Sequence, residues 1–109
     1  MTGHYDSVVV TLRGKLDIAS APALREQLLS LLHSGASQFV IDLSAIQCAD
    51  ASGLAVLVGS ESRVVTLGGA LRLAAPRPEV LGVLAATGIN RHLNVYPTVE
   101  AAAAARHAG

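Results

Sequence analysis

The residues with the clearest chemical potential are the segment Asp50-Ala51-Ser52-Gly53-Leu54. It follows an apolar, partly β-branched run at residues 39–43, which predicts a buried strand, and it precedes a pattern that predicts a helix. Ser52 is therefore expected in the first turn of a helix, just beyond a strand. Unpaired backbone N–H groups and the helix dipole make such a position tolerant of negative charge. The hydroxyl of Ser52 is thus a reasonable place for a phosphate group.

The same residues also have purely structural interpretations. Ser52 can be a serine at a helix start that binds nothing. Asp50 can be an N-cap whose carboxylate accepts the N–H of Ser52 or Gly53. Asp17, which follows the first predicted strand, can be a turn residue or can cap the helix that contains Pro22. The residue types alone leave these alternatives open.

Other site chemistries find little support in the sequence. There is no glycine-rich phosphate loop, and Asp50 stands where the nucleophile elbow of hydrolases needs glycine. Asp42 is placed like the phospho-acceptor of a response-regulator receiver, but the acidic pair and the later lysine of a receiver are missing. The four histidines are dispersed, and the single Cys48 is expected to be a small buried residue. We therefore expect no catalytic residue, no metal and no cofactor.

Composition indicates one folded domain, which we place at residues 1–109. Half of the residues (51%) are hydrophobic and 15% are charged, which is typical of a chain that buries a core. The net charge is zero and aromatic residues make up only 3%, which argues against direct nucleic-acid binding. The apolar runs are too short for membrane insertion, and the N-terminus lacks the features of a signal peptide. The expected location is the cytoplasm.

The elements that must position Ser52 alternate between strands and helices. We predict strands at residues 7–13, 39–43, 71–75 and 93–96, with residues 44–49 as a loop and a bend or bulge at Gly14. We predict helices capped by Ser20 before Pro22, at residues 52–67, from Pro78 to Gly88, and after a cap at Thr98. This alternation favours an α/β domain with a largely parallel sheet.

Four short motifs give the chain a family resemblance. In order they are Gly14-Lys15-Leu16-Asp17, Pro22-x-Leu24, Val40-Ile41-Asp42-Leu43-Ser44 and Asp50-Ala51-Ser52-Gly53-Leu54. These motifs closely resemble those of the STAS domain of bacterial anti-sigma factor antagonists. They match in order and spacing from about residue 8 to residue 104. The resemblance implies the STAS fold, an α/β domain with a mixed, mostly parallel sheet of four to five strands and about four helices. An additional strand usual in the family would precede Val8.

The resemblance also implies a function and a set of site residues. Ser52 would be the phosphorylation site, and Asp17, Asp50, Ala51, Gly53 and Leu54 would share the partner-binding surface with it. The unphosphorylated protein would bind an anti-sigma factor with a histidine-kinase-like Ser/Thr kinase fold and so release the sigma factor. A phosphatase would reverse the modification.

Two further roles are considered beside this switch. The alternative function is a constitutive STAS adaptor subunit of a lipid-transport ABC complex, or a stress-signalling scaffold, in which Ser52 only begins a helix. The oligomeric state is left open. The additional strand is either missing or reduced, or the true start of the chain lies upstream, and if the strand is missing, the unpaired backbone groups at the sheet edge could pair two copies in a homodimer.

Overall fold

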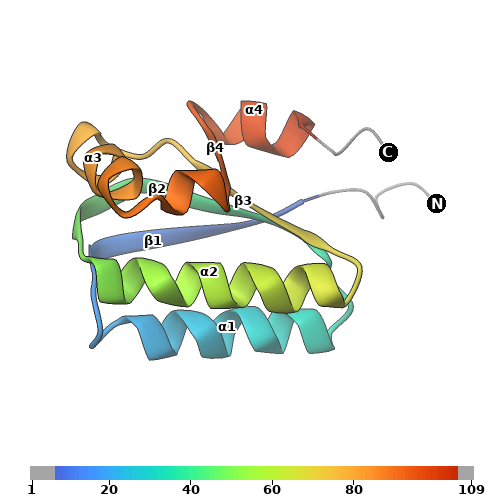
Figure 1. Cartoon of the computed structure of the whole chain (residues 1–109). Coiled ribbons are helices and arrows are strands. Elements are labelled where there is room, and N and C mark those ends of the chain that lie inside the picture. The colour runs from blue at the N-terminus through green and yellow to red at the C-terminus, as the bar shows by residue number, and fades with distance from the viewer. Residues whose placement is uncertain (1–6, 106–109) are drawn as a thin grey trace.

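The structure is a computed structural model that describes residues 7–105. Its strands and helices alternate along the chain, as predicted (Figure 1). The elements in order are β1 (Val8–Leu16), α1 (Ala21–His33), β2 (Gln38–Ala49), α2 (Ala51–Thr66), β3 (Ala70–Ala74), α3 (Pro78–Thr87), the short 3-10 helix η1 (Ile89–Arg91), β4 (Asn94–Tyr96) and α4 (Val99–Ala104).

The described strands form one sheet in the order β1-β2-β3-β4, and every neighbouring pair is parallel. The α/β class, the four strands and the four α-helices agree with the prediction. The additional strand that the resemblance allows would fall before Val8, on residues that lie outside the described range.

The core lies mainly between the sheet and the pair α1 and α2, which run side by side along one face (Figure 1). Successive residues of a strand point to opposite faces. Phe39 and Ile41 therefore enter this main core, whereas Val40 packs with Ala74 and with Ala102 of α4 on the other face. Thr98 caps α4 as predicted, because its hydroxyl accepts the N–H of Ala101 at 3.0 Å.

The prediction of a loop at residues 44–49 was wrong, because β2 continues through these residues to Ala49. This extension pairs only with β1, and the pairing ends at Leu16 opposite Ala49. The register shifts twice, and the predicted irregularity at Gly14 (φ +80) is confirmed as one of the two places. As a result, the chain leaves β1 and β2 at the same edge of the molecule.

Cys48 lies in this two-stranded extension and is exposed, so the prediction that it is buried was wrong. The physical reason is that β3 pairs with β2 only as far as Asp42, so Cys48 has a neighbouring strand on one side only.

Candidate functional site

The site is built where β1 and β2 end together. The last pair of the ladder is Leu16 with Ala49, and the carbonyl of Leu16 accepts the N–H of Asp50 at 3.1 Å. Asp17 and Asp50 are the next residues of the two segments, so the ladder holds them at one edge. The sheet register therefore brings the turn after β1 next to the start of α2.

Gly53 allows α2 to begin directly on the end of β1. The residue is buried, and a Cβ atom built on it would collide with the carbonyl group of Leu16 and lie 2.7 Å from the amide nitrogen of Asp17. Only glycine permits this approach without displacing backbone. Gly53 was predicted to belong to the partner surface because of the family resemblance alone, and the packing gives it a structural role.

Asp50 is the N-cap of α2, which confirms the structural interpretation of this residue. Its backbone is extended, and its carboxylate Oδ1 accepts the N–H of Gly53 at 2.8 Å. The helix begins at Ala51, so Ser52 is its second residue. The side chains of Asp50, Ala51 and Ser52 are exposed. Leu54 is 0% exposed and lies in the main core, so its side chain fixes the helix start and is not available for a surface contact.

Asp17 is a turn residue, which decides between the two structural interpretations. Its carboxylate Oδ1 accepts the N–H groups of Ala19 (3.1 Å) and Ser20 (3.0 Å). The hydroxyl of Ser20 accepts the N–H of Asp17 at 3.0 Å and donates to the carbonyl of Lys15 at 2.8 Å. Ser20 is the N-cap residue of α1, as predicted, but its hydroxyl makes no cap hydrogen bond because it is engaged in the turn.

The same hydrogen bonds predict how Asp17 titrates. The N–H of Ser20 is the main cause that holds the pKa of Asp17 below its usual 3.8. Partial desolvation of the carboxylate raises the pKa, but the Ser20 hydroxyl, the N–H of Ala19 and the charge of Lys15 lower it further. The ionised carboxylate therefore stabilises the fold above the unfolded-state pKa, and this contribution disappears as the pH falls through the lower folded-state pKa. We expect an NMR titration of the Asp17 carboxyl carbon to give a midpoint below 3.8. A midpoint at or above that value would contradict the turn described here.

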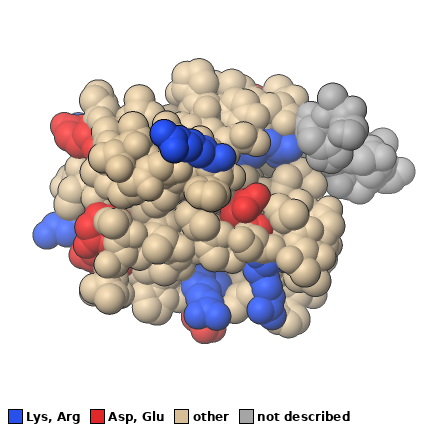
Figure 2. Space-filling model, viewed as in Figure 1, with Lys and Arg blue, Asp and Glu red and all other residues tan. Residues whose placement is uncertain are grey.

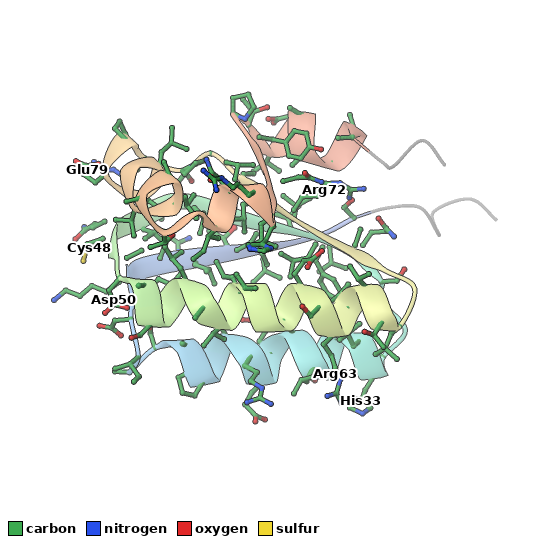
Figure 3. The ribbon with its side chains drawn as sticks, viewed as in Figure 1. His33, Cys48, Asp50, Arg63, Arg72 and Glu79 are labelled. Atoms are coloured by element: carbon green, nitrogen blue, oxygen red, sulfur yellow. The ribbon has the colours of Figure 1, made fainter. Side chains whose placement is uncertain are left out.

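The predicted site residues thus separate into two groups. Asp50, Ala51 and Ser52 are exposed and Asp17 is half-buried beside them, whereas Gly53 and Leu54 lie beneath this surface. Figure 3 shows Asp50 at the start of α2, at the same edge as Cys48. We call Asp17, Asp50, Ala51 and Ser52 the serine surface.

Asp42, the other acidic residue at a strand end, has a local structural role. Its carboxylate Oδ1 accepts the N–H of Ser44 at 3.0 Å, next to the first register shift of β2. Within the described residues no group of three or more His, Cys, Asp or Glu side chains is placed to hold a metal ion. No helix in this part of the chain is long and apolar enough to cross a membrane.

The described residues thus form an α/β fold with a parallel sheet and an exposed serine at the start of a helix. The chain belongs to the STAS domain family, whose model matches residues 1–102. A relative from Bacillus subtilis, the anti-sigma-B factor antagonist, is 31% identical over 92 residues, which is 84% of each chain.

Solved structures share the fold. An anti-sigma factor antagonist from Mycobacterium paratuberculosis has a TM-score of 0.82 and 26% identity, over 92% of this chain and 85% of the other. The Bacillus cell fate determinant SpoIIAA, in its phosphorylated form, has a TM-score of 0.68 and 20% identity, over 94% and 93% of the two chains. The predicted STAS fold is therefore confirmed.

Proposed function

We propose that this protein is an anti-sigma factor antagonist that is switched by phosphorylation of Ser52. The observation that carries the proposal is the exposed Ser52 hydroxyl at the second residue of α2, on the same surface as Asp17 and Asp50. The relatives from Bacillus subtilis and Mycobacterium paratuberculosis, which are named as antagonists of anti-sigma factors, favour this function over the adaptor of a lipid-transport complex.

In this proposal the unphosphorylated serine surface binds an anti-sigma factor and so releases the sigma factor. The anti-sigma factor has a histidine-kinase-like fold and uses ATP. The Ser52 oxygen attacks the γ-phosphorus, ADP leaves, and the hydroxyl proton passes to the kinase. A phosphatase later hydrolyses the phosphoserine, and the cycle takes place in the cytoplasm. The chain itself acts as a binding protein, and the chemistry belongs to its partners.

Local electrostatics are sufficient for the switch. A phosphate adds about −1.5 to −2 charges at Ser52. Its own helix N-terminus tolerates this charge, because the first turn of α2 presents unpaired N–H groups and a positive dipole end. A docked partner tolerates it poorly, since the dianion lies two residues from the Asp50 carboxylate and must lose water in the interface. The fold need not rearrange for the complex to separate.

The test is ATP-dependent release of the complex with the cognate anti-sigma factor, followed by size-exclusion chromatography. We expect the wild-type protein to bind without ATP and to separate after ATP is added. Ser52→Ala retains the geometry of the surface but has no acceptor oxygen, so it is expected to bind and to stay bound with ATP. If Ser52→Ala is released by ATP as fast as the wild-type protein, the acceptor is not Ser52.

A further inference from the structure

A groove of about 310 Å³ lies between α1 and α2, on the outer side of the helix pair. Four residues of each helix line it. They are Arg25, Leu28, Leu29 and Leu32 of α1, and Val56, Gly59, Ser60 and Arg63 of α2. Both sets have the spacing i, i+3, i+4, i+7, so each is one continuous row along one face of its helix. We call this the α1–α2 groove.

The floor of the groove is apolar, and its two ends are basic. Leu28 is buried, and Leu29, Leu32 and Val56 are half-buried, so apolar surface remains accessible between the helices. The helices follow strands of a parallel sheet and therefore run in the same direction. Arg25 begins one row and Arg63 ends the other, which places them at opposite ends, about 10 Å apart along the helix axes.

Both arginines are exposed, and neither forms an ion pair within 4.0 Å with another residue of the described range 7–105. Figure 2 shows basic side chains along the lower edge of the molecule, with an acidic side chain next to them, where Figure 1 places α1 and α2. Figure 3 shows Arg63 directed toward the end of α1. Glu26 and Glu61 lie on the same helices but do not line the groove.

Gly59 is a second feature of the groove that indicates room for a bound partner. It lies in the middle of α2, where glycine costs roughly 0.5–1 kcal/mol relative to alanine. A Cβ atom at this position would meet no heavy atom within 4 Å, so packing inside the chain does not require glycine here. The missing side chain instead leaves room at the groove for another backbone to approach.

We propose that the α1–α2 groove binds an acidic amphipathic helix of a protein partner. Parallel helix rows with an apolar floor and small residues are suited to receive a third helix. The two arginines lie two helical turns apart along the groove, which is the distance spanned by seven residues of a bound helix. They therefore favour a helix that carries two Asp or Glu residues, seven positions apart, beside its apolar face. A second copy of this groove is repelled by like charge, and the vesicle arm of the test below distinguishes a partner helix from an anionic lipid surface. The groove is distinct from the serine surface, and the proposal does not rest on the proposed function.

The probe is a capped amphipathic peptide of about 20 residues. Its leucine face is flanked by two glutamates that lie about two helical turns apart. A matched peptide carries lysine in place of both glutamates. Binding to the full chain is measured by fluorescence anisotropy, with phosphatidylglycerol vesicles as a separate arm. We expect the acidic peptide to bind about tenfold or more tightly than the lysine peptide.

Protein variants locate the binding. The double charge reversal Arg25→Glu with Arg63→Glu is expected to reverse the preference, so that the lysine peptide binds better. Gly59→Leu fills the groove from a position with free space. The substitution is therefore expected to lower the affinity for the acidic peptide, while circular dichroism reports an intact fold. All variants are expected to keep the wild-type interaction with the cognate anti-sigma factor, which separates this proposal from the previous one. Equal binding of both peptides, binding of neither, or binding to vesicles alone would overturn the proposal.

Discussion

Replacing Gly53 by alanine is expected to destabilise the fold by about 3 kcal/mol, the upper end of the usual range for overpacking. The added Cβ would collide with the carbonyl group of Leu16, which is already held in the last rung of the β1–β2 ladder. Because the obstacle is backbone and not a flexible side chain, either α2 or the end of β1 must move. For a domain of this size the change corresponds to a fall in Tm of roughly 10–20 °C, measured by thermal denaturation.

The control for this prediction is Gly59→Ala in the same helix. A Cβ at Gly59 meets nothing within 4 Å, so the substitution is expected to stabilise α2 by roughly 0.5–1 kcal/mol through the reduced entropy of the unfolded chain. The two substitutions make the same chemical change and are expected to have opposite signs. Equal effects on Tm would contradict the contact between α2 and the end of β1.

Ser52→Asp is expected to weaken binding to the cognate anti-sigma factor about a hundredfold, which corresponds to about 2.8 kcal/mol of docking energy. Ser52 is exposed at the serine surface, so the new carboxylate would lie in the docked interface near Asp50 and would have to be desolvated there. The fold is expected to remain intact, because an acidic residue in the first turn is favourable for the helix. Isothermal titration calorimetry measures the affinity, and thermal denaturation measures the stability.

Ser62→Asp is the matched control for this change. Ser62 is exposed in the same helix but lies ten residues further along it. The substitution adds the same charge away from the serine surface, and we expect the affinity to stay within about twofold of the wild-type value, as for a remote, solvent-exposed charge. If both variants bind equally weakly, the cause is net charge and not the position of Ser52.

The alternation of strands and helices could be predicted because each apolar run was short and was followed by a residue that typically ends a strand or begins or ends a helix. The ends of α3 and α4 show this. Pro78 lies in the first turn of α3, Gly88 ends that helix with a left-handed backbone (φ 76), and Thr98 caps α4. These signals act within a few residues, so they can be recognised without knowledge of the tertiary structure.

The extension of β2 could not be predicted, because two register shifts interrupt its alternation. The first lies between Thr11 and Arg13, where two steps of β1 correspond to three steps of β2, from Asp42 to Ala45. Residues 44–49 therefore lose the period of two that predicts a strand. The exposed position of Cys48 was missed for the same reason, since no local pattern indicates that the sheet narrows to two strands before this residue.

The family motif proposed Ser52, Asp50 and Asp17 as site residues, and local chemistry suggested that Asp50 caps α2, which the structure confirms. The way in which the chain brings these residues to one edge could not be predicted. The contact of Gly53 with the end of β1 depends on the β1–β2 register, which no local pattern contains. The same holds for the α1–α2 groove, whose two rows come from separate helices.

The most direct test of the central claim is to map the phosphate after incubation of the protein with its cognate anti-sigma factor kinase and ATP. Tandem mass spectrometry of the digested protein is expected to find one phosphate, on Ser52, and none on the neighbouring Ser44 or Ser60. The Ser52→Ala variant is expected to remain unmodified under the same conditions. A phosphate on another residue of the wild-type protein, or none at all while the kinase modifies a control substrate, would contradict the account.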